Sequence, residues 1–191
     1  PWIEQWQGDL IALLGPRSEL ARSLMAGEIE SAEQTLAEWQ AWFPDRLYLE
    51  VQRCGRADDE AHVQATAALA RLHALPLVAT NDVRFLREED FEAHEARVCI
   101  NQGYTVADNR RPRDYTPQQY LKSPEEMATL FADLPEAVEN TVRIAERCTV
   151  TLSFGTYYLP DVPVPEGQTV DEQLAERSRV GLQERFQETP P

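Results

Sequence analysis

The sequence predicts an α/β fold built on a small parallel sheet. Segments with strand and helix patterns alternate along the chain, and the run Leu77 to Ala79 is apolar on both faces, with Pro76 before it and Asn81-Asp82 after it. Strands of that kind are typical of parallel sheets covered by helices. Ligands of such sheets collect at the carboxyl ends of the strands, so we expect any functional site near Asp82 and Arg84.

The first half of the chain carries three expected strands. Gly15-Pro16 ends the first apolar run, and capping residues follow at Ser18 and Ser31. We expect strands at Gly8–Leu14 and Leu47–Gln52, helices at about Ser18–Ala26, Ser31–Trp42 and Asp58–Ala74, and a third strand that begins at Leu77. This spacing is typical of parallel β-α-β units. Because three strands are too few to close a barrel, we expect further sequence before residue 1.

Helix signals dominate after Phe85. Two capping patterns with proline begin at Thr116 and Ser123, and each has a glutamine or glutamate three residues later. The expected elements are a helix at about Glu88–Gln102 ended by Gly103, a helix at each of the two caps, a helix at Pro135–Arg147 with Val138, Val142 and Ala145 inward, and a short strand at Thr149–Phe154.

The last part of the sequence predicts a connector and one helix. Residues 155–167 are rich in proline and have no periodicity, which is typical of an extended linker. A capping box at Thr169–Glu172 starts a helix whose apolar side consists of Val170, Leu174, Leu182 and Phe186. We expect the partner of that side to lie beyond residue 191.

The composition narrows the functional classes. A net charge of −15 argues against nucleic-acid binding by this chain itself, because such binding depends on Lys and Arg neutralising phosphates. The three cysteines are widely spaced and form no CxxC pair, which favours reduced thiols. No apolar stretch approaches the roughly 20 residues of a membrane span, and the start has no signal-peptide pattern. A cytoplasmic protein is therefore expected.

Asp82 and Cys54 are the potential metal ligands among the residues that follow the three expected strands. A divalent site needs several converging ligands, and Arg84 brings a positive charge to where a second ligand would be useful. We therefore expect Asp82 to cap a helix or to pair with a neighbouring arginine rather than to bind a metal.

The three histidines do not form a cluster. His62 and His73 lie on one expected helix about 16 Å apart, at a rise of about 1.5 Å per residue, and cannot share an ion. His94 is flanked by Glu92 and Glu95, and we expect it to be solvated or locally paired. The sequence contains no HExxH zinc motif, no serine nucleophile elbow and no P-loop.

A basic loop at residues 110–113 (RRPR) leaves two interpretations open. It could contact a phosphate group. The favoured interpretation is a solvated face whose charge is balanced by Asp108 and Asp114.

Long runs of the sequence resemble one protein family. The matching runs are LPLVATNDVRF, DFEAHEARVCINQGYT, RRPRDYTPQQYLKSPEEMATLFADLPEAVENTVRIAERC and YYLPDVPVPEG. They are similar to the catalytic α subunits of bacterial replicative DNA polymerase III, the C-family polymerases, over nearly the whole chain and most specifically from about Pro44 onward. The resemblance implies that residues 1–153 are the later part of a polymerase and histidinol phosphatase (PHP) domain, a distorted parallel β/α barrel. Residues 154–191 would be a connector and the first helix of the polymerase palm.

The resemblance also bears on the metal site. In metal-binding members of the family, the turn that matches residues 81–85 carries an Asp-x-His ligand pair, and the turn after the first strand carries a cysteine. Asp82 matches the aspartate, Arg84 stands in place of the histidine, and Pro16 stands in place of the cysteine. These three positions are remnants of a degenerate site, so the resemblance implies no metal, cofactor or catalytic residue in this segment.

For function, the resemblance implies a DNA-directed DNA polymerase, a nucleotidyltransferase, as the whole protein. Mg²⁺ would act in the palm, outside this segment. The segment itself is expected to be inactive, to brace the palm and to dock the proofreading exonuclease subunit and other subunits of the polymerase III holoenzyme, with little or no DNA contact of its own. Two alternatives remain: a metal-dependent phosphoesterase or proofreading exonuclease, and a free-standing interaction domain.

Overall fold

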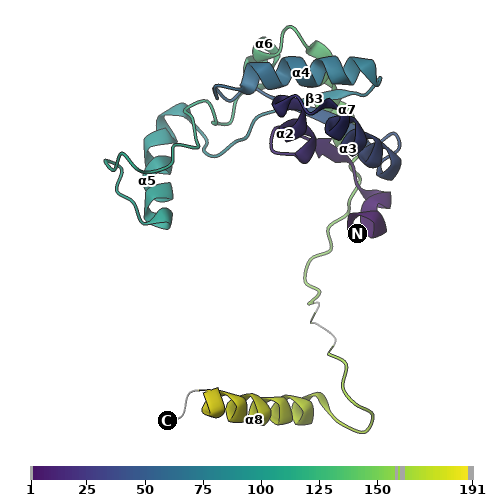
Figure 1. The fold of residues 1–191 in the computed structure, drawn as a ribbon, viewed down its shortest axis with the longest axis vertical. Helices are drawn as coiled ribbons and strands as arrows, with labels where there is room; N and C mark the ends of the chain where they lie inside the picture. The colour runs from purple at the N-terminus through teal and green to yellow at the C-terminus, as the bar shows by residue number, and fades with distance from the viewer. Residues whose placement is uncertain (1, 158, 160–161, 189–191) are drawn as a thin grey trace. The chain divides into compact units, whose positions relative to one another are not determined.

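A computed structural model describes residues 2–157, 159 and 162–188. The chain divides into two compact units, residues 1–149 and 150–191. The first unit contains a parallel sheet and most of the helices, and the second contains one helix (Figure 1). The assignment of the two predicted domains, divided at residue 153, stays a prediction.

The sheet has three parallel strands, β1 (Ala12–Leu14), β2 (Leu47–Gln52) and β3 (Leu77–Thr80), in the order β1-β2-β3. The predicted parallel α/β arrangement is confirmed at this level, while a closed barrel is not observed in the described residues. The first strand is shorter than expected because α1 (Trp2–Trp6) and the 3-10 helix η1 (Gln7–Asp9) precede it. The Arg46 side chain donates to the backbone carbonyls of the first two residues of η1 and of Leu10, which holds this segment against the start of β2.

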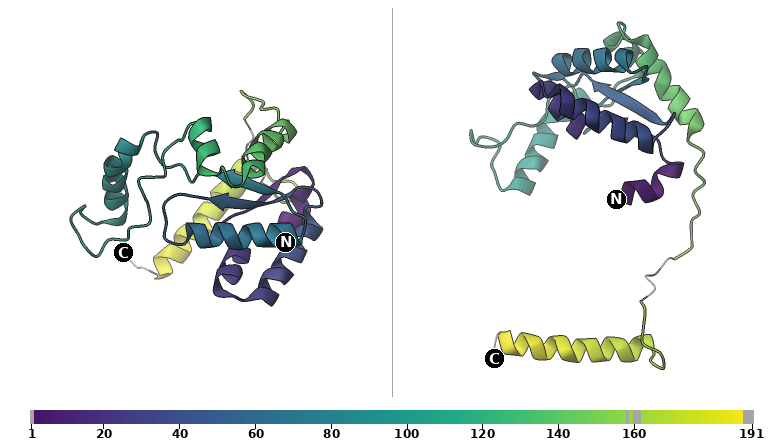
Figure 2. Two further views of the ribbon diagram at one scale, coloured as in Figure 1. Left: turned by 90° about the horizontal axis from the view of Figure 1, so that it is seen from above. Right: turned by 45° about the vertical axis from the view of Figure 1, so that its right-hand side comes forward.

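Helices α2 (Glu19–Ala26), α3 (Ile29–Trp42) and α4 (Asp59–Leu72) pack around the sheet, as Figures 1 and 2 show. Ser18 caps α2 as expected, with its hydroxyl accepting from the Ala21 amide at 3.1 Å. The expected cap at Ser31 is wrong, because α3 already begins at Ile29 and the Ser31 hydroxyl lies 3.1 Å from that of Ser23. One continuous core joins these helices to the strands, with Leu36, Leu49 and Val51 fully buried.

The next segment begins with the 3-10 helix η2 (Glu88–Asp90) and continues as α5 (Phe91–Gln102), so the single helix expected there is divided in two. Gly103 ends α5 in the left-handed conformation with φ 74°, as predicted. Figures 1 and 2 show α5 projecting from the rest of the first unit. The helix expected at Thr116 is absent: its capping contacts form, but they close only a turn, because Tyr120 bridges in parallel to Phe85.

Helices α6 (Pro124–Leu130) and α7 (Pro135–Arg147) agree with the predicted starts, and Ser123 forms the expected capping box with Glu126. The predicted inward face of α7 is wrong in part, because Val142 and Ala145 are exposed while Ala137 and Asn140 are buried.

Asn140 meets the outer edge of the sheet. In the register of β2 with β3, the carbonyl of Leu77 faces away from β2. The Asn140 amide donates to that carbonyl at 2.7 Å. A polar side chain on the buried face of α7 therefore satisfies an edge-strand acceptor.

The strand expected at residues 149–154 is absent, and Val150, Leu152 and Phe154 in the second unit are largely exposed. The described residues of 155–167 form no helix or strand; Tyr158, Pro160 and Asp161 lie outside the described residues. Helix α8 (Val170–Glu188) begins at the predicted capping box, where the Glu172 amide donates to the Thr169 hydroxyl at 3.2 Å. Its four apolar residues predicted to share one side are all exposed. Among the described residues, no helix has the length and apolarity to cross a membrane.

Candidate functional site

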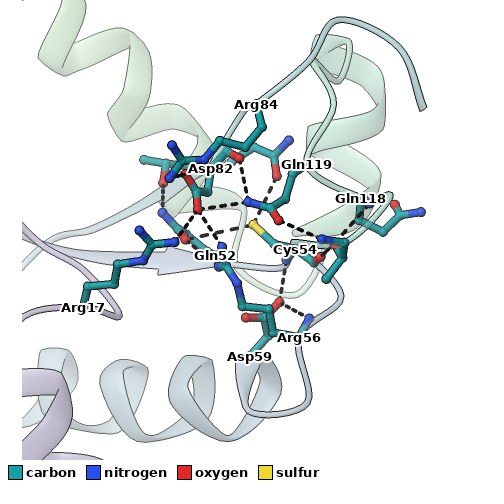
Figure 3. Close-up of polar contacts among 12 residues, drawn as sticks. Arg17, Gln52, Cys54, Arg56, Asp59, Asp82, Arg84, Gln118 and Gln119 are labelled. Atoms are coloured by element: carbon teal, nitrogen blue, oxygen red, sulfur yellow. Dashed lines mark hydrogen bonds and ion pairs between the residues drawn. The ribbon is translucent and has the colours of Figure 1, made fainter. Parts of the chain in front are cut away.

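The loops after the three strands meet at one edge of the sheet and bring their side chains together at Asp82 (Figure 3). Arg17 follows β1, Arg56 follows β2, and Asp82 and Arg84 follow β3. Carboxyl ends of neighbouring parallel strands lie at the same edge, so residues far apart in sequence become neighbours here. This is the place that the sequence predicted for a site.

Asp82 is bound by three guanidinium groups. Its Oδ2 atom accepts from Arg17 Nη2 at 3.0 Å and from Arg56 Nη2 at 2.6 Å, and its Oδ1 atom lies 2.7 Å from Arg84 Nη2. The Asp82 side chain is 16% exposed, so much of this attraction acts away from bulk water. The predicted pairing of Asp82 with a neighbouring arginine is confirmed, with two further arginines that the sequence did not identify.

Gln119 completes the coordination of Asp82. Its Nε2 atom donates to the Asp82 carboxylate at 3.0 Å and to the Asp82 backbone carbonyl at 3.1 Å, and its side chain is fully buried. Sequence reasoning placed Gln119 in a helix cap, and its Oε1 atom does accept from the Thr116 amide at 2.9 Å. Nothing in the sequence pattern indicated the second contact, which joins segments 37 residues apart.

Asp59, near the start of α4, positions Arg56. The Asp59 carboxylate accepts from the backbone amides of Cys54 at 2.5 Å and Arg56 at 3.0 Å, which closes the turn after β2. This turn directs the Arg56 side chain back over the sheet edge toward Asp82 (Figure 3). An acidic residue in the first turn of a helix is a recognisable signal, but its target is set by the fold.

Cys54, the other candidate ligand, is fully buried. Its Sγ atom lies 3.4 Å from Asn81 Oδ1, so the thiol is directed to an amide oxygen. Burial raises the pKa of the Cys54 thiol, although a backbone hydrogen bond to Asp82 opposes the shift. The protonated thiol is therefore favoured over the thiolate that a metal requires. The predicted free state of all three cysteines is confirmed.

A pocket of about 440 Å³ lies beside the cluster, with Pro16, Arg17, Glu50 and Asp82 in its wall. Glu50 accepts hydrogen bonds from Gln52 at 3.1 Å and from the Thr80 hydroxyl. A Cβ atom at Gly15 would lie 2.0 Å from Glu50 Oε2, so a larger residue there would require the Glu50 carboxylate to move. Two acids of this pocket, Asp82 and Glu50, are thus engaged in holding neighbouring groups.

The donor set does not fit a divalent metal. Three cationic groups surround one carboxylate, and a cation would have to displace them against their own charge. Pro16, which follows β1, has a side chain without a ligand atom. Within the part of the chain that the structure describes, no three His, Cys, Asp or Glu side chains converge in a way that could hold a metal.

The histidines lie apart from this cluster. His62 is buried in α4 beside the Thr66 hydroxyl at 3.3 Å, and His73 contacts Glu33 at 2.9 Å. Of the two alternatives expected for His94, solvation is wrong, because His94 is 6% exposed. The local pairing is confirmed as an ionic contact, with Glu95 Oε1 3.9 Å from His94 Nδ1, although this Nδ1 atom has no hydrogen-bond partner.

The basic loop is only partly the solvated face that was expected. Arg110 is exposed and pairs with Asp108 at 2.8 Å, as predicted. Arg111 is buried and pairs with the buried carboxylate of Glu95. The sequence could not reveal this, because Glu95 lies on α5 and faces the loop only after the turn at Gly103.

No family model matches the chain, but comparison with individual proteins gives clear relatives. The chain is 53% identical over 187 residues to the DNA polymerase III subunit alpha of Pseudomonas aeruginosa and 47% identical over 186 residues to that of Escherichia coli, in each case over 97% of its length. The corresponding subunit of Xylella fastidiosa is 45% identical over 189 residues, or 99% of the chain. The chain spans about 16% of the length of these curated relatives. The resemblance predicted from the sequence is confirmed as a similarity to one segment of DNA polymerase III α subunits.

Proposed function

We propose that these 191 residues are a segment of a replicative DNA polymerase. We further propose that the segment is a non-catalytic module stabilised by ion pairs between its own side chains. The whole polypeptide would carry out DNA-directed DNA synthesis by nucleotidyl transfer. The observation that carries the proposal is the binding of Asp82 by Arg17, Arg56 and Arg84. The extent of similarity to DNA polymerase III α subunits supports the assignment to the polymerase.

The arginines perform the structural task that a bound metal performs in other sites. Each one comes from a different strand end, so the carboxylate joins all three loops at the edge of the sheet. Gln119 extends the same connection to the segment before α6. The module needs no metal for this cross-link. The arginines occupy the carboxylate, so its residues offer no open position for an ion that could activate a nucleophile.

The remaining parts of the proposal concern the whole protein. The three parallel strands would belong to a larger PHP-type β/α barrel, and the second unit would lead into the palm, where carboxylates hold Mg²⁺. The module would brace that palm and present a docking surface to the proofreading exonuclease subunit. Contact with DNA would come through the rest of the polypeptide, because this segment carries a net charge of −15.

The alternative function is a metal-dependent phosphoesterase or proofreading exonuclease. Asp82 is the observation in its favour, because it matches a ligand position of metal-binding relatives. The arginines that occupy both of its carboxylate oxygens argue against this function.

The deciding experiment compares two activities. The isolated 191-residue chain is assayed with a phosphate monoester and with single-stranded DNA, each with added Zn²⁺ or Mn²⁺, and the full-length polypeptide is assayed for primer extension with Mg²⁺. We expect primer extension by the full-length protein and no hydrolysis by the chain. Hydrolysis that disappears in Asp82→Asn would establish the alternative. A full-length protein without polymerase sequence or primer extension would instead favour a free-standing interaction domain.

A further inference from the structure

Residues 84–120 leave the sheet and return to it, and backbone hydrogen bonds join the two ends of this segment. We call residues 84–120 the α5 lobe. The Arg84 amide donates to the Gln119 carbonyl at 2.8 Å, and the Leu121 amide donates to the Phe85 carbonyl at 3.1 Å. The lobe projects from the sheet of the first unit (Figures 1 and 2). Four side chains donate to Asp82. Two of them, those of Arg84 and Gln119, lie at the two ends of the lobe.

The lobe has its own small aromatic cluster, centred on His94. The His94 ring packs edge-on against Tyr115, with 4.6 Å between ring centroids, and at a tilt against Phe85 at 5.4 Å. Phe91 extends the cluster through Phe85 at 5.9 Å. Arg84 lies over the other partner ring, with its guanidinium carbon 5.5 Å from the centroid of Tyr115. His94 is thereby connected to Asp82 through three successive contacts, by way of Tyr115 and Arg84.

The charges around His94 come from three parts of the lobe. On α5 itself, Glu95 Oε1 lies 3.9 Å from His94 Nδ1, and Arg97 is close enough to act electrostatically. Arg84 acts from the first position of the lobe, and Arg111 acts from the loop by holding the other oxygen of Glu95. Glu95 favours a proton on His94, whereas burial, which is the largest effect, and the cations Arg97 and Arg84 oppose it; together they lower the pKa of His94.

We propose that the α5 lobe is an acid-released element: a proton on His94 opens the aromatic cluster and frees Arg84 and Gln119 from Asp82, while the three-stranded sheet stays folded. A charged imidazole requires water or a hydrogen-bond partner at both ring nitrogens, and the cluster offers Nδ1 none. Opening toward solvent satisfies both nitrogens. Because the ends of the lobe hold Asp82, the same event loosens the connection between the strand-end loops.

The test measures hydrogen exchange of backbone amides in the 191-residue chain at about pH 7.5 and about pH 5.5, corrected for the intrinsic pH dependence of exchange. We expect the protection of α5 to fall several-fold more than that of β2 at the lower pH, since β2 reports on the stability of the first unit as a whole. His94→Phe, which keeps an aromatic ring without a titrating nitrogen, should retain α5 protection at both pH values. His62→Phe is the matched control, because His62 is a buried histidine outside the lobe, and it should still lose α5 protection.

Three results would overturn the proposal. Parallel loss of protection in α5 and β2 would indicate global unfolding, and acid-sensitive exchange that persists in His94→Phe would assign the effect to other groups. If His94→Phe does not form the lobe, the wild-type chain decides the matter. The midpoint of the His94 ring titration followed by NMR must then coincide with the midpoint of α5 protection, and separate midpoints contradict the proposal.

Discussion

Arg84 and Asp82 are two residues apart in the chain, and their side chains meet at 2.7 Å between Nη2 and Oδ1. The segment after β3 thus supplies both the anion and one of the cations of the strand-end cluster. Arg17 and Arg56 reach the same carboxylate from the other two strand ends. One aspartate is therefore the common partner of three separate loops, and its removal has consequences for all of them.

Asp82→Asn should destabilise the first unit by about 2 kcal/mol, a value between those of exposed and buried ion pairs. The substitution keeps the shape of the side chain and leaves three guanidinium groups without their anion. Urea denaturation followed by circular dichroism measures the change. Asp108→Asn is the matched control, because Asp108 pairs only with the exposed Arg110, and it should have a much smaller effect. Equal effects of the two substitutions would contradict the structural role of the cluster.

Asn140→Ala should cost about 1–3 kcal/mol of unfolding free energy, because it leaves the Leu77 carbonyl unsatisfied at a buried strand edge. Glu139→Ala, at the exposed neighbouring position on α7, is the control and should change stability little. Denaturant midpoints of the two variants make the comparison. A neutral Asn140→Ala would mean that water replaces the amide without penalty.

Ala74→Gly should stabilise the chain by about 0.5–1 kcal/mol, because Ala74 has a φ of 51° and glycine adopts this conformation without a steric cost. Ala74 follows the end of α4, where the Leu75 amide donates back to the Ala70 carbonyl at 2.9 Å. Ala68→Gly, on the exposed side of the same helix, should lower the stability by a comparable amount. Thermal melts of both variants should therefore shift in opposite directions, and shifts of the same sign would refute the explanation.

Stability of the first unit should fall as the pH decreases below about 6.5, the ordinary pKa of histidine. Burial lowers the pKa of His62 in the folded chain, so the unfolded chain binds more protons in the window between the folded value and 6.5. The contribution of His62 is fully present above this window and is lost as the pH falls through it. Urea denaturation at a series of pH values measures the slope, and His62→Leu should flatten it. An unchanged slope in that variant would assign the pH dependence to other groups.

The parts of the structure that depend on local pattern were predictable from the sequence. Strand β2 and helix α7 have the expected bounds, and the capping boxes at Ser123 and Thr169 form as their spacing indicated. The helix expected at Thr116, by contrast, does not form. Its capping residues make their local contacts, but the pairing of Tyr120 with Phe85 holds the chain extended. A contact between residues 35 positions apart outweighs a local helix signal.

The candidate site was located correctly by the expected strand end at Asp82, and its full composition was not. Arg84 was identified because it is adjacent in sequence, whereas Arg17, Arg56 and Gln119 have no local feature that predicts a shared partner. Arg111 was assigned to a solvated face, and His94 to solvent or a local pair, because their sequence neighbours are charged, yet both are buried in the α5 lobe. Burial of this kind follows from how a loop folds over a helix, which periodicity within a single helix does not encode.

The guanidinium groups at the strand ends are side chains of the polypeptide, so they are present as soon as the chain is synthesised. An ion in the same role would have to be acquired from the medium and could be taken away by a competing chelator. Loops joined by arginine and aspartate are anchored as soon as the chain folds, whatever the nutritional supply of zinc or manganese. Such an anchor removes one dependence on the environment.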